Sequence, residues 1–150
     1  MNRTWLAALS LFAFSFPALA QTVTDGDTIK LDGKTYRLLG IDALETHQAR
    51  GDGWRGGEVA TAYLRGLMRG RAITCTPKVK DRYGRTVAVC YSDGRDLGAD
   101  MVSAGMAYAF VRYSRDYVEQ EASALAAGLS VHGHRCGTPW EWRARRRGDE

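Results

Sequence analysis

Short apolar runs, separated by turn residues, fill the chain after residue 20. Runs at 22–24, 28–31 and 35–41 are rich in β-branched and other apolar side chains, and Asp32-Gly33-Lys34 separates the last two. An Asp-Gly pair between two such runs is typical of a tight β-hairpin turn. The pattern therefore predicts a hairpin, with 35–41 as one continuous strand.

Two further runs end at Cys75 and Cys90, on either side of the turn-like segment 81–85. If these runs form a second hairpin, the two cysteines face each other and can be bridged. A disulfide closing a loop of this size stabilises a protein by about 3 kcal/mol in the chain-entropy model. The alternative is that both are small buried hydrophobic residues.

Helical spacing begins at residue 58. Segments 58–69, 97–105 and 117–129 are predicted helices, with Gly70 and Gly105 as end signals. The apolar positions expected to face the core of the first and last of these are Val59, Ala62, Tyr63, Leu67, Val118, Ala122, Leu125 and Leu129. The order of elements predicts an α+β domain, with a small antiparallel barrel and helices on one side. Residues 130–150 are expected to form a C-terminal tail that packs on the surface or frays.

The first twenty residues have a different pattern. Arg3 is followed by a nearly unbroken apolar run, and Ala18-Leu19-Ala20 has the small-x-small form of a cleavage site. A spanning helix needs about 20 apolar residues, and this run is shorter. Residues 1–20 are therefore interpreted as a cleaved signal peptide, 21–150 as the mature domain without a membrane segment, and the protein as periplasmic or secreted.

Composition narrows the possibilities without naming a function. The chain has 150 residues, 45% of them hydrophobic, and a formal net charge of +4. It has enough apolar residues for a core, which excludes a disordered chain, and its charge is too small to indicate nucleic acid by itself. Nothing in it indicates an oligomer, so a monomer is expected.

Export bears on the third cysteine, Cys136. Its role is left open, because an odd cysteine count leaves one thiol outside intramolecular pairs. The spacing His132-x-His134-x-Cys136 could hold a metal ion, but the neighbouring glycines favour a surface turn.

Carboxylates flank the two strands of the first predicted hairpin. Asp27 begins its first strand and Asp42 follows its second, so antiparallel pairing brings them to the same end. Two carboxylates there suit a hard cation such as Ca²⁺. Glu45 lies three residues further on, where it can act as a base on water. Each residue also has a plain interpretation, as a turn or a cap.

Two arginines complete this set. Arg37 lies within an otherwise apolar strand and Arg85 ends the 81–85 turn. Planar guanidinium groups bind phosphate in a bidentate manner. Carboxylates, a cation and two arginines together indicate phosphodiester hydrolysis.

Three motifs in order make the sequence similar to a known family. Asp-Gly-Asp-Thr at 25–28, Arg-Leu-Leu-Gly-Ile-Asp-Ala-Leu-Glu-Thr at 37–46 and Asp-Arg-Tyr-Gly-Arg at 81–85 closely resemble the staphylococcal nuclease (thermonuclease) family, and the resemblance runs over about 22–129. It implies a five-stranded OB-type β-barrel with three helices. It also implies Ca²⁺-dependent hydrolysis of DNA and RNA to 3′-phosphate products.

The resemblance also implies roles for individual residues. Asp27 and Asp42 would bind Ca²⁺ through their side chains, and Ala43 through its backbone carbonyl. Glu45 would be the general base, and Arg37 and Arg85 would stabilise the transition state. Tyr83 and Tyr113 would lie beside the substrate.

Two departures from the family pattern concern the surroundings of the site. Leu44 stands where proline is usual, in the loop that holds Glu45, and Val111 stands where a second substrate-side tyrosine can occur. Stacking of a base on an aromatic side chain contributes about 1–3 kcal/mol to the free energy of binding, so its absence at Val111 would weaken nucleotide binding.

Two other functions remain open. The first is a catalytically silent OB-type module that binds nucleic acid or another polyanion. Against it, such a module has no need for Asp27, Asp42 and Glu45 beside two arginines, because carboxylates repel phosphate. The second is hydrolysis of some other extracellular phosphodiester by the same chemistry.

Overall fold

The computed structural model describes residues 21–48 and 53–148. The predicted signal peptide lies outside these residues. In the part described, none of the helices has both the length and the apolar content to cross a membrane.

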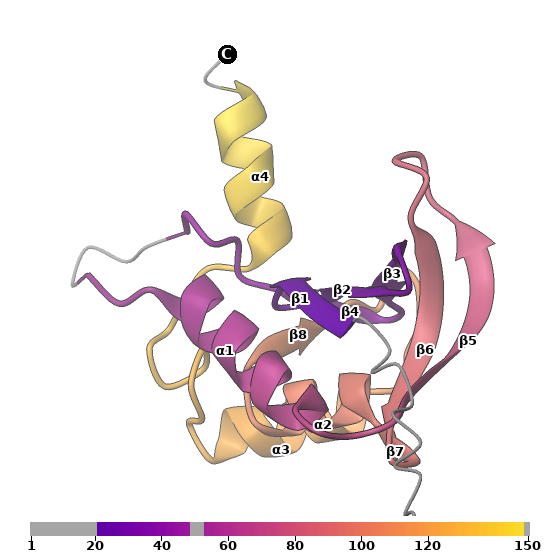
Figure 1. Ribbon diagram of the computed structural model, residues 1–150. Coiled ribbons are helices and arrows are strands. Elements are labelled where there is room, and N and C mark those ends of the chain that lie inside the picture. The colour runs from indigo at the N-terminus through magenta and orange to yellow at the C-terminus, as the bar shows by residue number, and fades with distance from the viewer. Residues whose placement is uncertain (1–20, 49–52, 149–150) are drawn as a thin grey trace, which may run out of the picture.

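Strands and helices follow in the mixed order of an α+β domain (Figure 1). The strands are β1 (Gln21–Asp25), β2 (Thr28–Leu31), β3 (Lys34–Leu38), β4 (Ile41–Ala43), β5 (Ile73–Lys80), β6 (Thr86–Ser92), β7 (Arg95–Asp96) and β8 (Ala107–Ala109). The helices are α1 (Gly56–Met68), α2 (Leu97–Ser103), α3 (Val118–Ala126) and α4 (Pro139–Gly148). The α+β class is therefore confirmed.

The main sheet has the strand order β1-β2-β3-β6-β5, with β7 paired to β6. Its neighbours are antiparallel except β3 and β6, which are parallel. Hydrogen-bonded pairing does not join β1 to β5, so the sheet is OB-like but not a closed barrel. A separate antiparallel pair, β4 and β8, lies beside it.

The first predicted hairpin is confirmed. Leu31 pairs with Lys34, and Asp32 and Gly33 both have positive φ, of 48° and 78°. Two positive φ values in a two-residue loop match the right-handed twist of the flanking strands.

The single strand expected at 35–41 is wrong, because the chain turns at Gly40. Its φ is 75°, in the left-handed region that glycine tolerates best. The turn ends β3 and starts β4, which pairs with β8 through Asp42 and Tyr108. Asp42 therefore lies within a short strand of its own.

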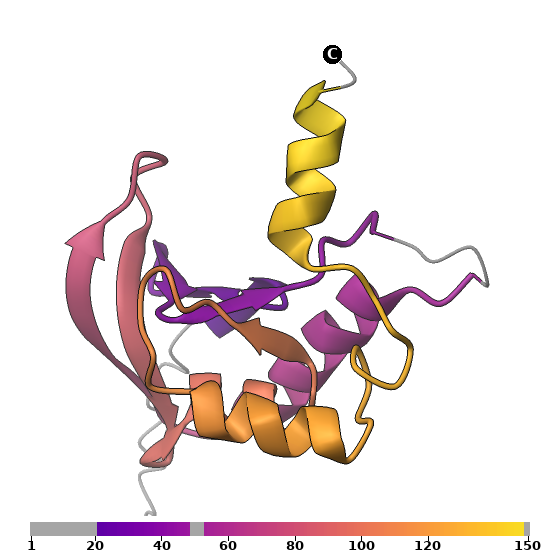
Figure 2. The ribbon, with the colours of Figure 1, turned by 180° about the vertical axis from the view of Figure 1, so that it is seen from behind.

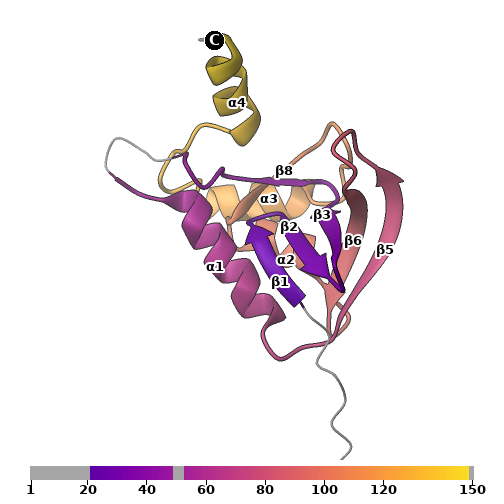
Figure 3. The ribbon, with the colours of Figure 1, turned by 45° about the horizontal axis from the view of Figure 1, so that its top comes forward.

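The core lies between the sheet and helices α1 and α2. Figure 3 shows α1 alongside β1, and the view from behind in Figure 2 shows α3 crossing the base of the domain. The largest fully buried residues of the core are Ile29, Leu38, Ile41, Leu64, Leu97, Met101 and Val102.

The helices bury their predicted core-facing residues only in part: Tyr63 and Leu67 of α1 pack against the core, but the fully buried positions are others. In α1 the buried line is Ala60, Leu64 and Met68, while Val59 is exposed. In α3 the buried residue is Ala124, and Leu125 is 60% exposed. Apolar spacing located these helices but did not identify their most buried residues.

A fourth helix replaces the expected tail. Thr138 and Glu141 form a reciprocal cap at its start: the Thr138 amide donates to Glu141 Oε2 at 3.2 Å, and the Glu141 amide donates to Thr138 Oγ1 at 3.4 Å. Proline at the first helical position, as with Pro139, also favours a helix start. Three helices were expected, and the described residues contain four.

Candidate active site

Arg37 joins two carboxylates from different strands. Its Nη1 forms an ion pair with Asp27 Oδ2, and its Nη2 donates to Asp42 Oδ1 at 2.9 Å. The side chain of Asp42 is only 1% exposed. One guanidinium on β3 therefore holds together the residue before β2 and the middle residue of β4.

Backbone and hydroxyl donors fix Asp27 further. Thr28 Oγ1 donates to Asp27 Oδ1 at 2.9 Å, and the Ala43 amide donates to Asp27 Oδ2 at 3.2 Å. The structure thus brings Asp27, Asp42 and Ala43 together. It does so through Arg37 and the edge of β4 rather than through the hairpin geometry expected from the sequence.

Glu45 follows β4 in a loop held by its neighbours. Its amide donates to Gln48 Oε1 at 3.3 Å, and its carbonyl accepts from the Gln48 amide at 2.8 Å. Helix α1 begins against this loop, because a Cβ at Gly57 would lie 2.4 Å from the Glu45 carbonyl oxygen. Only glycine allows this approach, which fixes the backbone of Glu45.

Leu44 also anchors that loop. It is buried in a small second cluster with Tyr108 and Val131, against which Trp54 and Trp140 pack. Apolar packing at Leu44 therefore holds the segment where the family pattern has proline.

Arg143, on α4, is the site residue that the sequence analysis missed. Its Nη2 donates to Asp42 Oδ2 at 2.5 Å, and its Nη1 donates to Glu45 Oε1 at 2.6 Å. It therefore links the buried carboxylate to the partly exposed one. The signal that could have located it is the Thr138-x-x-Glu141 capping pattern, which predicts a helix in place of a tail.

Gln48 is a second residue that the sequence did not single out. Its Nε2 donates to the Gly137 carbonyl at 2.8 Å, just before α4, while its other atoms hold Glu45. The base of α4 and the Glu45 loop are therefore joined.

The charges of these groups influence one another. Burial raises the pKa of Asp27, but the adjacent Arg37 guanidinium offsets this and holds the pKa below its usual value. Burial keeps the pKa of Asp42 above its usual value, although Arg143 and Arg37 oppose the effect. Burial, with the charge of Asp27, raises the pKa of Asp25 to about 6. Three carboxylates thus crowd together and need positive charge nearby.

The donor chemistry of this cluster suits a hard cation. Asp27, Asp42 and the Ala43 carbonyl supply oxygen, the ligand atom that Ca²⁺ prefers. Yet in the described part of the chain no group of three or more His, Cys, Asp or Glu residues is arranged to hold a metal ion. The guanidinium groups of Arg37 and Arg143 supply the positive charge around these oxygens instead.

Arg85 lies just before β6, which runs parallel to β3. Arg37 is opposite Val87 in that pairing, two residues after Arg85. The Arg85 side chain donates through Nε to Asp81 Oδ2 at 2.7 Å, and the Asp81 Oδ1 also accepts from the Arg85 amide. Asp81 therefore orients Arg85 at the start of the strand next to that of Arg37.

The two tyrosines expected near a substrate are both exposed. Tyr83 is 67% exposed, and the guanidinium carbon of Arg85 lies 5.4 Å from the centre of its ring. Tyr113 packs beside Phe110, with ring centroids 5.1 Å apart. These contacts do not test the expected roles of the two tyrosines, which stay predictions.

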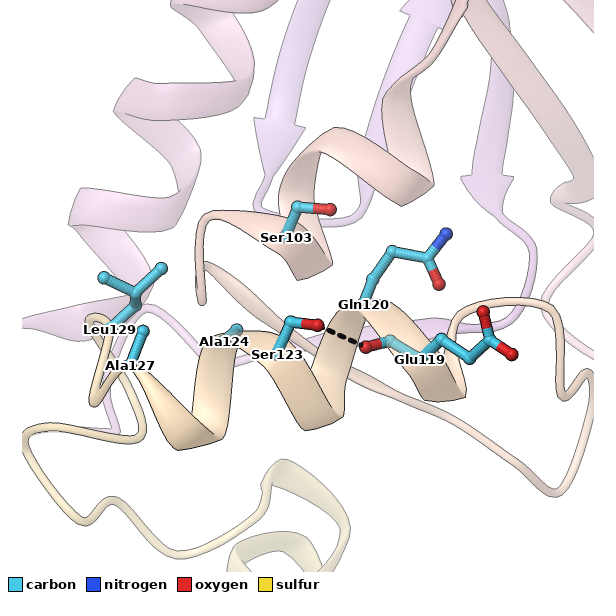
Figure 4. Close-up of a pocket in the computed structure, with 7 residues that line it drawn as sticks. All are labelled: Ser103, Glu119, Gln120, Ser123, Ala124, Ala127 and Leu129. Carbon is cyan, nitrogen blue, oxygen red and sulfur yellow. Dashed lines mark hydrogen bonds between the residues drawn. The ribbon is translucent and has the colours of Figure 1, made fainter.

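A hollow of about 500 Å³ lies away from this cluster, between α2 and α3 (Figure 4). Its lining is Ser103, Glu119, Gln120, Ser123, Ala124, Ala127 and Leu129, with no basic residue among them. Its lining suits neither a phosphate nor the chemistry of the carboxylate cluster.

Comparison with known proteins identifies the family to which the chain belongs. The family model described as staphylococcal nuclease homologue matches residues 35–130. An Escherichia coli protein named uncharacterized endonuclease is 34% identical over 154 residues, covering 92% of this chain and 96% of its own.

Two further relatives carry nuclease names. A Shigella flexneri protein named micrococcal nuclease is 32% identical over 92% of this chain and 90% of its own. The Arabidopsis thaliana staphylococcal-like nuclease CAN1 is 30% identical over 75% of this chain but only 34% of its own. The chain therefore belongs to the staphylococcal nuclease family and, as a member, is a hydrolase of the nuclease class.

Proposed function

We propose that the protein is a Ca²⁺-dependent nuclease that hydrolyses phosphodiester bonds of DNA and RNA. The observation that carries the proposal is the position of Glu45. Its side chain is 39% exposed, and through Arg143 it adjoins the buried cluster of Asp27, Arg37 and Asp42. A carboxylate that reaches solvent beside a fixed charged cluster is suited to take a proton from water.

In this mechanism Glu45 accepts a proton from a water molecule while the oxygen of that water attacks phosphorus. A P–O bond to the water oxygen forms, and the P–O bond to the 5′ oxygen breaks. The 5′ oxygen leaves with the bonding electron pair and takes a proton from solvent, so the products are a 3′-phosphate and a 5′-hydroxyl. Arg37 and Arg85 donate hydrogen bonds to the phosphate oxygens as negative charge grows on them. Asp81 keeps Arg85 oriented for this contact.

The proposal assigns the cation to Asp27, Asp42 and the Ala43 carbonyl. When bound there, Ca²⁺ would neutralise the crowded carboxylates and add positive charge beside the phosphate. Tyr83 and Tyr113, both exposed, are assigned to the nucleotide flanking the cut.

One observation favours a second candidate, a silent module that binds nucleic acid. Asp27, Asp42 and Glu45 are all paired with arginines. Such pairing could serve a structural purpose alone. A nuclease differs from this module in requiring Ca²⁺ and Glu45 for turnover.

The test is cleavage of single-stranded DNA by the purified protein with Ca²⁺, with a Ca²⁺ chelator, and with the Glu45→Gln variant. Loss of a catalytic proton acceptor costs about 10²–10⁴-fold in rate, so cleavage should fall by that factor in the variant and disappear with the chelator. DNA binding without any cleavage would instead support the silent module. Cleavage of small diesters but not of DNA would point to another phosphodiester substrate.

We also propose that the protein is exported and acts as a monomer. The disulfide between Cys75 and Cys90 supports export, because such bonds persist in oxidising compartments. N-terminal sequencing of protein from the periplasm or medium should begin at Gln21, and light scattering should give the mass of one chain.

A further inference from the structure

Helix α4 stands out from the body of the domain (Figures 1 and 3), and its Arg143 contacts the carboxylate cluster. Its ten residues include Arg143, Arg145, Arg146 and Arg147, against a single acidic residue, Glu141. We propose that α4 is a nucleic-acid-binding arm that holds the phosphodiester backbone of the substrate beside the bond to be cut. This inference rests on the proposed function and names a surface for it.

The base of α4 is fixed to the domain. Pro139 is buried, and Trp140 packs between two aromatic rings, with centroids 5.9 Å from Tyr108 and 5.2 Å from Phe110. The reciprocal Thr138–Glu141 cap closes the first turn. The helix therefore leaves the domain in a set direction, so its arginines have defined positions relative to the site.

Arg143 places the first half of α4 at the reacting groups. It contacts Asp42 at 2.5 Å and Glu45 at 2.6 Å while its side chain remains 31% exposed. A phosphodiester positioned for attack by water at Glu45 must therefore lie close to α4.

The second half of α4 continues the same basic surface. Arg146 and Arg147 lie three and four residues after Arg143, so they share its face one turn further from the domain. Both are exposed. A strand whose reacting phosphate lies at Glu45 would meet these two guanidinium groups with its neighbouring phosphates.

An aromatic ring lies within this surface. Trp142 is half-buried, and the guanidinium carbon of Arg146 lies 5.0 Å from its ring centre. Arginines tracking a backbone together with an aromatic side chain are the combination found in single-strand binding surfaces.

The composition of α4 favours nucleic acid over a membrane surface. A helix that lies on a membrane needs apolar residues along one whole face. In the part of α4 that follows Trp142, the only apolar side chain is that of Ala144. This part of α4 therefore presents positive charge without an apolar face, and a polyanion is the partner that matches it.

The test compares two double variants of the full-length protein with the same loss of charge. One is Arg146→Ala with Arg147→Ala. The control is Arg69→Ala with Arg71→Ala, in the segment between α1 and β5, at the opposite end of the domain from α4 (Figure 1). Both control residues are exposed. Circular dichroism checks that each variant is folded.

Binding of a fluorescent 20-nucleotide single strand is measured by anisotropy in the presence of a chelator, over a range of salt concentrations. Each lost phosphate contact lowers the slope of log K against log salt by about 0.7 for single strands, so the α4 variant should lose about 1.4. We expect its Kd to rise about tenfold at low salt, an effect of the size that such contacts produce, and the control to change it by less than about twofold.

Equal weakening in both variants would overturn the proposal, because only overall charge would then matter. Unchanged binding in the α4 variant, or no binding by the parent protein, would also overturn it. Cleavage of the same strand with Ca²⁺ is measured separately. Selective loss of binding in the α4 variant without any cleavage by the parent would leave the arm supported and reject the nuclease activity.

Discussion

The guanidinium of Arg143 donates hydrogen bonds to both carboxylate oxygens of Asp42, a residue 101 positions earlier in the chain. Nη2 lies 2.5 Å from Oδ2, and Nη1 lies 3.3 Å from Oδ1. Since Nη1 also reaches Glu45, a side chain from α4 adds a second guanidinium to a site built by the first strands. The C-terminal segment is thus part of the site.

Replacing Arg143 should change how the site responds to Ca²⁺. In Arg143→Ala, buried Asp42 keeps only Arg37 as its charged partner. Hydrogen bonds to charged groups contribute about 1.5–3 kcal/mol, so we expect a loss of that order in the free energy of unfolding without Ca²⁺. Ca²⁺ should then stabilise the variant more than the parent, because the oxygens of Asp42 and Glu45 no longer share their charge with the guanidinium of Arg143. Thermal unfolding with Ca²⁺ and with a chelator measures both effects.

The matched control for that experiment is Arg145→Ala. This residue has the same charge and lies on the same helix, but two positions along, which places it on the far side from Asp42. Equal responses of the two variants to Ca²⁺ would mean that Arg143 does not compete for the carboxylates.

Arg85→Ala should impair turnover much more than binding. Arg85 is oriented by Asp81, and its proposed contact forms with charge that develops on phosphate. Loss of one such donor lowers kcat by about 10²–10³-fold. We expect that drop with little change in KM, measured by steady-state cleavage of a short oligonucleotide. The neighbouring Arg82→Ala is the control, since Arg82 donates to the Tyr83 hydroxyl, whereas Arg85 donates to Asp81. A change confined to KM would assign Arg85 to binding alone.

The sequence predicted local features well. The turn at Asp32-Gly33 and the facing cysteines follow from rules about neighbouring residues, and both are present. It also indicated the proximity of Asp27 and Asp42, although the cause differs. The chain turns at Gly40, so an ion pair with Arg37 holds the two carboxylates together rather than the ends of one hairpin.

Long-range contacts escaped prediction for a physical reason. The arginines of α4 have no apolar periodicity, so nothing local links Arg143 to Asp42. In α3, regular spacing located the helix, but the buried side chain is the small Ala124, and Leu125 faces outward. Which face a helix buries depends on its neighbours in space, and periodicity alone does not specify them.

His132 should make stability depend on pH. Its Nε2 is buried without a hydrogen-bond partner, and burial holds its pKa below the usual value. As pH falls through about 6.5, the unfolded chain takes up a proton before the folded one does, so the free energy of unfolding falls. Urea unfolding at pH 7.5 and 5.5 measures this loss.

The variant His132→Phe keeps a ring against Tyr108, which His132 meets edge-on with centroids 5.3 Å apart. It removes the titrating group, so part of the stability loss between the two pH values should disappear. If the variant and parent lost the same amount, another group would be responsible.

The disulfide between Cys75 and Cys90 should matter for the sheet more than for chemistry. It joins β5, an edge strand, to β6, and β6 in turn pairs with the strand that carries Arg37. The two cysteines are 15 residues apart, and closing a loop of this length is worth about 3 kcal/mol. Cys75→Ala with Cys90→Ala should therefore lower the free energy of unfolding by about that amount, measured with urea. A reductant should weaken the parent but leave this variant unchanged, and Cys136→Ser should keep the parent's sensitivity to reductant.

The same double variant should still cleave DNA at nearly the parent's rate at temperatures below its unfolding midpoint. The reason is that the bond joins β5 to β6 and includes none of the carboxylates or arginines of the site. A large loss of turnover in a folded variant would show that the bond also positions Arg37.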